Sequence, residues 1–377
     1  MDQTQLNQPA VDIDIAQNEE ARERIFRFRH RVEKPDSGDG VLKDDLDENA
    51  ILIYAESQGE IVASYRIVVA NDMSITAEFT KNYGLDNFKD FENKDFSFTS
   101  MLHIDPKWRS TTLLGKILNI SYRILRQKNI KFNFSDCSPA LVQFFEHLGY
   151  RRYSNNFSKP GEGYRVPLLL ITEDLKHLQI IRSPFLPIAE KFENSEATRD
   201  WYTDTFPAYI GYVTERLIPM KEFWGFLSNR LNEASTALLN DLSDEEVKKF
   251  LSAGIVLHSK QGDIIVKKGD LGNEMFMILK GSAEVCEFKN GKKYSLAIFS
   301  EGEIFGEMAF LSETPRTADV VALADMEILV LTQAFLKNFM KMMPETANKV
   351  LFNFSLILIE RLKSNTTNLV TKLSDEN

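Results

Sequence analysis

An acidic and a basic residue lie close together in a glycine-containing stretch toward the C-terminus. Glu307 directly follows Gly306, and Arg316 comes just after Pro315. A glycine that opens a short helix leaves backbone N–H groups free to face an anion. Arg316 can give a phosphodiester two parallel hydrogen bonds, and Glu307 can accept one from a ribose hydroxyl. These residue types at this spacing indicate a site for a nucleotide monophosphate.

The segment around these residues has the pattern of an all-β domain. Short β-rich runs recur between glycines over residues 240–345. Glycine suits the sharp turns between such runs because it tolerates a positive φ. Regular short strands separated by glycine turns predict a β-roll, also called a jelly roll. Residues 346–377 after it predict a C-terminal helix.

Residues 240–345 resemble the cyclic-nucleotide-binding domain shared by catabolite activator protein, protein kinase regulatory subunits and gated channels. The resemblance to its phosphate-binding cassette is carried by Phe305, Gly306, Glu307, Ala309, Leu311, Pro315, Arg316 and Ala318. It implies that Glu307 binds the ribose 2′-OH and that Arg316 binds the cyclic phosphate. It also implies backbone contacts from Gly306, Met308 and Ala309, and a hydroxyl contact from Thr317. The regulatory ligand implied is a cyclic nucleotide.

Two features of this stretch bear on the ligand. Bacterial relatives favour cAMP, whereas Thr317 is the residue type that favours guanine in some relatives, so cAMP and cGMP both stay open. Asp319 stands where a small hydroxyl or apolar residue is commoner, and like-charge repulsion there predicts weaker binding. The alternative is a β-roll that has lost its ligand. The presence of both Glu307 and Arg316 argues against that alternative.

A second stretch with chemical potential begins at Met101. A predicted strand leads through a proline turn into a helix. Such a helix start can hold the pyrophosphate of coenzyme A or the phosphate of a phosphopantetheine arm. The predicted residues that bind the acyl-donor phosphate are Arg109, Ser110, Thr111, Thr112 and Leu113.

Mixed helix and strand over residues 20–175 resemble the GNAT acyltransferase fold, whose closing helix and turn are similar to Asp136–Tyr150. Thr112 and Leu114 stand where that fold has glycine or another small residue. Phe145 stands at the position of the usual tyrosine general acid, and it has no proton to give. These departures leave open a non-catalytic cyclic-nucleotide sensor with a decayed acyltransferase fold.

Three short segments resemble N-acyl amino acid synthases and acyl-homoserine lactone synthases: Arg24–Arg29, Asp44–Asp47 and Ala63–Arg66. Such relatives transfer long acyl chains from acyl carrier protein to a free amine. By charge, Asp44, Asp45 and Asp47 can hold the acceptor's ammonium, and Arg66 can hold its carboxylate. An acidic turn is more commonly only a solvated loop, and that alternative stays open.

Other residues are weaker candidates for the acyl-transfer chemistry. Phe132, Phe134 and Phe144 can line an acyl tunnel, although alternating phenylalanines more often belong to a core. The attacking amine must lose a proton, for which Asp105 or Glu78 can serve as a catalytic base. His103 and His147 have no carboxylate partner nearby in the sequence, which disfavours a catalytic role for either.

Composition excludes several other functions. The chain has 377 residues and a formal net charge of −10, which disfavours binding to nucleic acid. After the β-roll the sequence predicts a single helix and no helix-turn-helix. The two cysteines, Cys137 and Cys286, fall in different predicted domains, so neither a disulfide nor a metal site is expected. No signal peptide or transmembrane segment is evident, and a cytoplasmic location is predicted.

Together these features predict an α+β architecture with five parts: a flexible tail (1–20), a GNAT-like domain (21–182), a helical connector (183–239), the β-roll (240–345) and the final helix (346–377). The predicted function is a cyclic-nucleotide-regulated N-acyltransferase whose donor is acyl-CoA or acyl carrier protein. A protein lysine acetyltransferase controlled by cAMP is a further alternative. The C-terminal helix can also support an oligomer.

Overall fold

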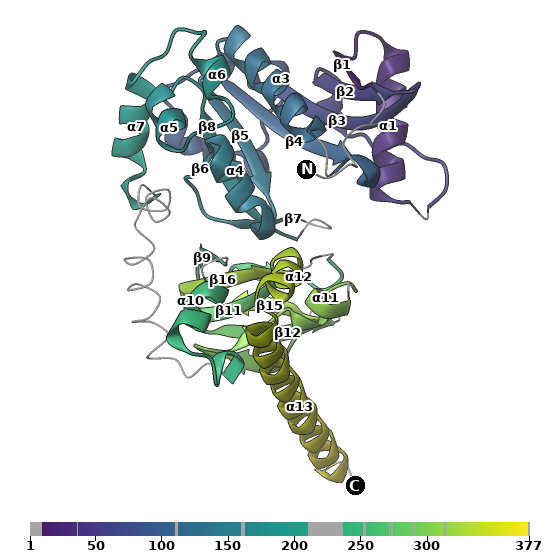
Figure 1. Ribbon diagram of the computed structural model, residues 1–377, viewed down its shortest axis with the longest axis vertical. Coiled ribbons are helices and arrows are strands. Elements are labelled where there is room, and N and C mark those ends of the chain that lie inside the picture. The colour runs from purple at the N-terminus through teal and green to yellow at the C-terminus, as the bar shows by residue number, and fades with distance from the viewer. Residues whose placement is uncertain are drawn as a thin grey trace. The chain divides into compact units, whose positions relative to one another are not determined.

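The computed structural model describes residues 10–35, 37–109, 112–159, 163–209, 237–251, 254–270, 272, 274–289, 292–312 and 314–375 (Figure 1). The chain divides into two compact units. The first contains most residues up to Gly211, and the second contains Tyr212–Asn377 with two short segments, Cys137–Gln143 and Asn155–Val166. Each unit is described by itself.

The N-terminal unit is built on an eight-stranded sheet with the order β1-β2-β3-β4-β5-β8-β6, and β7 pairs with β8. β1 to β4 pair antiparallel, whereas β4 and β5 are parallel. The strands are β1 (Asp12–Ile15), β2 (Ile51–Ser57), β3 (Glu60–Val69), β4 (Phe96–Ile104), β5 (Phe132–Cys137), β6 (Arg151–Arg152), β7 (Phe157–Lys159) and β8 (Gly163–Ile171).

Seven α-helices accompany this sheet in the described part of the chain. They are α1 (Glu19–Glu33), α2 (Ala77–Tyr83), α3 (Leu113–Gln127), α4 (Val142–Leu148), α5 (Leu175–Ile180), α6 (Leu186–Ala189) and α7 (Ala197–Thr205). The Asn18 side chain caps α1 by accepting from the N–H of Ala21 at 2.9 Å. Ile25, Phe26 and Phe28 of this amphipathic helix are buried.

Two predicted boundaries are wrong within the described residues. Asp12–Ile15, expected in a flexible tail, form β1 and pair with β2, because alternating isoleucines give this segment one apolar face. Residues 183–209, expected in a connector, belong to the N-terminal unit. There Phe206 packs with Phe88 in an aromatic core. Residues 210–236 of the predicted connector lie outside the described residues.

The C-terminal unit is a β-roll of two four-stranded sheets, which confirms the predicted fold. One sheet has the order β10-β15-β12-β13 and the other β14-β11-β16-β9. The strands are β9 (Ile255–Ser259), β10 (Ile264–Val266), β11 (Glu274–Lys280), β12 (Ala283–Lys289), β13 (Lys292–Phe299), β14 (Ile304–Phe305), β15 (Asp319–Ala322) and β16 (Met326–Thr332).

Four α-helices complete this unit among its described residues: α10 (Asp244–Leu251), α11 (Glu307–Ser312), α12 (Gln333–Met342) and α13 (Pro344–Asp375). The core joins the sheets to these helices. Phe310 of α11, Phe339 of α12 and Phe354 of α13 are all buried in one cluster. α13 is a single helix of 32 residues, as Figure 1 shows in yellow at the C-terminal end. The mixed αβ domain, the β-roll and the final helix thus agree with the predicted architecture.

Within the described residues no helix is long and apolar enough to cross a membrane. Cys137 and Cys286 are both buried, and neither forms a disulfide.

Candidate functional site

The β-roll contains a pocket at the residues predicted to bind a cyclic nucleotide. It encloses about 510 Å³ of space, part of which is open to solvent. This volume falls in the range of sites for small organic ligands. The pocket lining is mostly apolar with a few polar groups, as in such sites. It consists of Val266, Val285, Phe299, Phe305, Gly306, Glu307, Met308, Ala309, Arg316, Thr317, Ala318 and Val320.

Three groups hold Arg316 in place: a backbone carbonyl, a carboxylate and an aromatic ring. Its Nη1 donates to the carbonyl of Gly306 at 2.8 Å, and its Nη2 donates to Oε2 of Glu274 at 3.1 Å. The guanidinium lies over the Phe276 ring, 5.6 Å from its centroid. Burial lowers the pKa of Arg316, while the carboxylates of Glu274, Glu307 and Asp270 oppose that shift. A buried, oriented cation that lines a pocket is suited to an anionic phosphate.

Gly306 occupies the tightest position of the pocket wall. Its φ is +79°, in the left-handed region that glycine adopts freely. A Cβ at this position would lie 2.8 Å from Nη1 of Arg316 and 3.1 Å from the carbonyl oxygen of Glu274. The first distance is shorter than real Cβ contacts and the second is tight, so a side chain at this position would force Arg316 to shift.

We therefore expect Gly306→Ala to weaken cyclic nucleotide binding at least ~10-fold, because the new methyl group displaces Arg316 from its position. The left-handed backbone adds a stability cost of about 1–2 kcal/mol. Gly262→Ala is the matched control, since its φ is +89° and no atom lies within 4 Å of the new Cβ. Titration calorimetry with cAMP and cGMP measures the affinities. Equal losses of affinity in both variants would contradict this role of Gly306.

Glu307 opens α11 and has a partner on the C-terminal helix. Its Oε1 lies 2.8 Å from Nη1 of Arg361, a residue of α13. The same Arg361 donates to the carbonyl of Ile304 and lies over the Phe299 ring, 4.5 Å from its centroid. Phe299 and Glu307 both line the pocket. Arg361 thus connects α13 to two groups that a bound nucleotide would contact.

The remaining predicted ligand contacts lie at the same pocket. Met308 is exposed and Ala309 is buried. The Thr317 hydroxyl approaches Sδ of Met308 at 3.7 Å. Asp319 is mostly buried, and its Oδ1 accepts from the N–H of Lys268 at 2.9 Å. That hydrogen bond gives the unusual aspartate a structural role at the start of β15.

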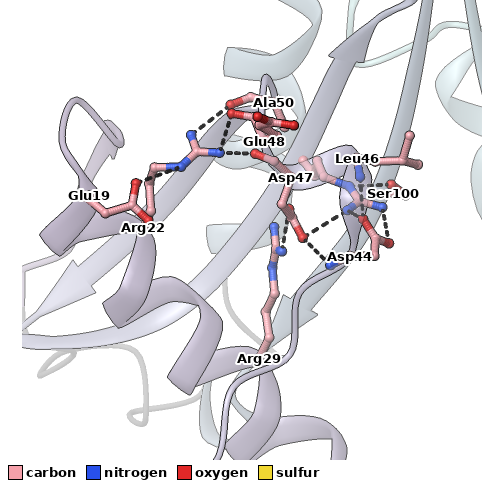
Figure 2. A network of polar contacts seen from close by, with 10 residues as sticks. Glu19, Arg22, Arg29, Asp44, Leu46, Asp47, Glu48, Ala50 and Ser100 are labelled. Atoms are coloured by element: carbon pink, nitrogen blue, oxygen red, sulfur yellow. Dashed lines mark hydrogen bonds and ion pairs between the residues drawn. The ribbon is translucent and has the colours of Figure 1, made fainter. Parts of the chain in front are cut away.

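In the N-terminal unit, the acidic turn predicted to bind the acceptor forms a network of ion pairs (Figure 2). Asp47 lies between two arginines: Nη1 of Arg29 is 2.8 Å from its Oδ1, and Nη1 of Arg66 is 3.1 Å from its Oδ2. Arg66 also donates to Oδ2 of Asp44 at 3.1 Å and to the Ser100 hydroxyl at 3.0 Å. Arg29, Asp47 and Arg66 are each at most 2% exposed.

The structure therefore brings together three of the four predicted acceptor residues, Asp44, Asp47 and Arg66, and leaves Asp45 exposed on the turn. Burial is the largest influence on Asp47 and favours its neutral form, but Arg29 and Arg66 together lower its pKa. Two carboxylates and two guanidiniums balance in charge, so neither aspartate is a bare anion. Ion pairs of Asp47 with two buried arginines hold the turn in place, which distinguishes it from an ordinary solvated loop.

The predicted acyl-donor residues lie around the start of α3. Arg109 is exposed, and its Nε donates to the carbonyl of Ile104 at 3.3 Å. Thr112 immediately precedes the helix and makes no side-chain cap, while Leu113 is buried. Ser110 and Thr111 lie outside the described residues.

The pairing of β4 with β5 ends before β4 does. Their register pairs Phe96–Phe98 with Phe132–Phe134, after which β4 continues to Ile104 along β3. Beyond that point side chains bridge the strands, since the Ser135 hydroxyl donates to the carbonyl of Thr99 at 3.2 Å. A gap between the carboxyl ends of two parallel strands is a common location for a ligand site.

The aromatic candidates for a tunnel do not share one environment. Phe132 and Phe134 are fully buried and pack edge-on against Phe88, so they are core residues in the described fold. Phe144 is half-buried on α4 next to Phe145. The two residues predicted as a catalytic base belong to different elements. Asp105 caps a short turn by accepting from the N–H of Lys107 at 2.9 Å, and Glu78 is exposed on α2.

His103 has a carboxylate partner that the sequence did not reveal. Its Nε2 lies 3.4 Å from Oε2 of Glu33, at the end of α1. The two residues are 70 positions apart, and the pair forms only because α1 packs along β3 and β4. His103 comes three residues after Ser100, so regular strand alternation would have put the two on opposite faces, and nothing in the sequence signalled the pair. His147 is exposed on α4.

Two family models match this chain. Residues 22–172 match the model described as N-acyl amino acid synthase FeeM. Residues 256–342 match the model described as cyclic nucleotide-binding domain. The first covers the acidic turn and the start of α3, and the second covers the pocket with Glu307 and Arg316.

Similar proteins match the C-terminal part. A cAMP-dependent protein kinase regulatory subunit from Blumeria graminis is 34% identical over 106 residues, 27% of this chain and 26% of that protein. A cyclic AMP receptor protein from Thermus thermophilus is 32% identical over 127 residues, 33% of this chain and 57% of that protein. The chain therefore spans between about a quarter and somewhat over half of these relatives.

Solved structures match the same part. A cyclic nucleotide-binding domain from Methylobacillus flagellatus shows 25% identity and a TM-score of 0.36, with 40% of this chain and 84% of that one covered. The catabolite activator protein of Thermus thermophilus shows 30% identity and a TM-score of 0.33, with 36% and 62% covered. The two family matches show an N-terminal N-acyl amino acid synthase domain over residues 22–172 and a C-terminal cyclic nucleotide-binding domain over residues 256–342.

Proposed function

We propose that this protein transfers an acyl group from a thioester donor to the amino group of an amino acid, and that a cyclic nucleotide controls the reaction. The observation that carries the proposal is the presence of both family domains in one chain. Covalent linkage keeps the two domains at a high effective concentration, so coupling between them needs little extra binding energy. The donor is an acyl carrier protein thioester or an acyl-CoA.

The acceptor proposal rests on charge and position. Asp44, Asp47 and Arg66 form a polar network that adjoins the Ser100 hydroxyl on β4. Asp47 and Arg66 are buried, whereas Asp44 is exposed. An amino acid carries one ammonium and one carboxylate, and a network of both signs offers a partner to each. The donor proposal places the phosphates near Arg109, where β4 and β5 have separated. The donor and acceptor residues thus belong to the same end of β4.

The regulatory proposal rests on the contacts of Glu307. Its carboxylate pairs with Arg361 of α13 and also lines the nucleotide pocket. A ribose hydroxyl that donates to Glu307 changes the partners of that carboxylate, and with them the attachment of α13. Phe310 of α11 packs in the same core cluster as Phe339 and Phe354, which gives α11 a second connection to the helices. α13 is then the element whose position depends on the ligand.

We expect Arg361→Ala to uncouple the two domains. Cyclic nucleotide affinity should change only a few-fold, because Glu307 and Arg316 remain. The ligand's effect on acyl transfer, which a coupling of about 1–3 kcal/mol makes 5- to 150-fold, should largely disappear. Lys363→Ala is the matched control, since it removes an exposed cation of α13 that pairs with Glu360 on the same helix. An unchanged ligand effect in Arg361→Ala would refute this role.

The activity itself is tested with the full chain and defined substrates. Palmitoyl-coenzyme A and palmitoyl-acyl carrier protein are offered in turn as donors, with a mixture of amino acids or a lysine-containing peptide as acceptor. Mass spectrometry should find an N-acyl amino acid in a time-dependent amount. Acylation of the peptide alone would favour a protein lysine acyltransferase. No product from any pair of substrates would favour a non-catalytic sensor and overturn the proposal.

We also propose that α13 supports self-association. Phe352, Leu356, Ile359 and Leu362 are all at least 46% exposed. Their spacing of three or four residues places them along one side of the helix. A second copy of the same stripe would cover these side chains. Light scattering of the full chain measures the mass, and a monomer at all concentrations would contradict this proposal.

A further inference from the structure

His103 and Glu33 form a polar pair at the end of α1. Nε2 of His103 lies 3.4 Å from Oε2 of Glu33, which is long for a hydrogen bond. The Glu33 side chain is 56% exposed, so a solute can reach the carboxylate. Nδ1 of His103 is buried, and within the described structure it has no hydrogen-bond partner. The nitrogen that faces Glu33 is therefore the one nearest to solvent.

A bulge in β4 directs His103 toward α1. The register pairs Ser64 with His103 and Arg66 with Ser100, so two residues of β4 stand opposite Tyr65. Met101 in the bulge has a φ of +53°. Bulges re-aim side chains and are frequent beside functional sites. Because of the extra residue, His103 lies on the same face of the sheet as Ser100 and Arg66.

This position lies between the residues proposed for acceptor and donor. Along β4, Ser100 contacts Arg66 on one side of His103. On the other side, Arg109 donates to the carbonyl of Ile104, the next residue after His103. β4 is no longer paired with β5 at this point. When the amine attacks the thioester, a group that takes a proton from the amine has to lie between the acceptor residues and the donor residues.

We propose that His103 is the general base of the acyl transfer and that Glu33 holds the acceptor's ammonium against it. This inference rests on the function proposed above. The ammonium binds the Glu33 carboxylate, and Nε2 of His103 takes one of its protons. The freed lone pair on nitrogen attacks the thioester carbonyl, the new C–N bond forms and the C–S bond breaks. The thiolate leaves as a thiol after taking the amine's second excess proton, and His103 returns its own proton to solvent.

The charged groups around the pair fit this assignment. Glu33 and Arg29 come from α1, Arg66 from β3, and Asp44 and Asp47 from the acidic turn. Arg29, Arg66, Asp44 and Asp47 neutralise one another through their ion pairs. Lys34 follows Glu33 directly and favours its ionised form, as does His103. In the described contacts no arginine neutralises Glu33. In this inference Glu33 therefore replaces the paired Asp44 and Asp47 as the partner of the ammonium, and Arg66 stays the partner of the acceptor's carboxylate.

The test measures steady-state acyl transfer from palmitoyl-acyl carrier protein or palmitoyl-coenzyme A, whichever donor the wild type uses, to its best amino acid acceptor. His103→Ala should lower kcat at least ~100-fold with little change in the KM of the donor, because general bases contribute about 10²–10⁴-fold. Added imidazole should restore part of the lost rate. Glu33→Gln should mainly raise the KM of the acceptor. His147→Ala and Glu20→Gln, two exposed positions, should behave as wild type.

The outcomes separate this inference from the function on which it rests. A wild type that is inactive with every substrate overturns both. An active wild type with an equally active His103→Ala overturns the inference alone, and so does a loss that imidazole does not restore. His103→Gln keeps a polar side chain of similar size without a basic nitrogen. If it folds and retains full activity, His103 is not the base.

Discussion

Replacing Arg316 with alanine is expected to lower the affinity for cyclic nucleotide at least ~100-fold, a loss of about 3 kcal/mol. The guanidinium lines the pocket and is held by the Gly306 carbonyl and by Glu274. Hydrogen bonds between charged groups contribute about 1.5–3 kcal/mol each, and a cyclic phosphate can accept two from one arginine. Titration calorimetry with cAMP and cGMP on the full chain measures this loss.

The same substitution leaves Glu274 buried without its cation, so part of the effect can come from lost stability. Arg316→Lys keeps the charge but not the paired donors, and it should lose affinity by an intermediate amount. Glu274→Gln combined with Arg316→Ala removes the bare carboxylate and should restore stability without restoring binding. Lys260→Ala, at an exposed position of the same domain, should leave binding unchanged. Nucleotide binding by a folded Arg316→Ala at wild-type affinity would contradict the site.

Replacing Asp47 with alanine is expected to lower the free energy of unfolding of the N-terminal unit by about 3–5 kcal/mol. The substitution removes the carboxylate that lies between Arg29 and Arg66 and leaves two buried cations facing each other. Removal of one member of a buried ion pair has effects of this size. Asp45→Ala is the matched control, because Asp45 belongs to the same turn but is exposed. Chemical denaturation followed by near-UV circular dichroism measures the difference.

The pH dependence of stability is a second test of the contribution of Asp47. The folded state lowers the pKa of Asp47 below its ordinary value. Its contribution to stability is therefore complete above the ordinary aspartate range and is lost as the pH falls through the lower, folded value. Asp47→Ala should flatten the acidic part of the stability curve, whereas Asp45→Ala should not. Equal curves for both variants would show that the network does not stabilise the unit.

The pocket that we propose for the nucleotide could be predicted from the sequence because its residues are local. Gly306, Glu307 and Arg316 lie on consecutive elements, a strand end, a short helix and the turn after it. Their spacing alone brings them to one pocket. The partners of these residues could not be predicted. Glu274 is 42 residues from Arg316, and Arg361 is 54 residues from Glu307, so only the folded β-roll shows what holds them.

For the residues that we propose for acyl transfer, the sequence indicated the residue types but not how they are arranged. The sequence pointed to an acidic turn and to Arg66, but it could not show that Asp44 and Asp47 pair with Arg66 instead of standing free. The partner of His103 was missed because α1 must first pack on β4. For Phe132 and Phe134 the sequence left two environments open. Their alternation fits either a tunnel or a core, and the rings around them place them in the core.

The rate of N-acyl amino acid formation shows whether a single chain couples cyclic nucleotide binding to N-acyl transfer. The rate of N-acyl amino acid formation is followed by mass spectrometry with no nucleotide, with saturating cAMP and with saturating cGMP, for the wild type and for Arg316→Ala. We predict that at least one nucleotide changes the wild-type rate at least ~5-fold and that Arg316→Ala shows no change. A measurable wild-type rate that neither nucleotide alters, while calorimetry shows binding, would contradict the account.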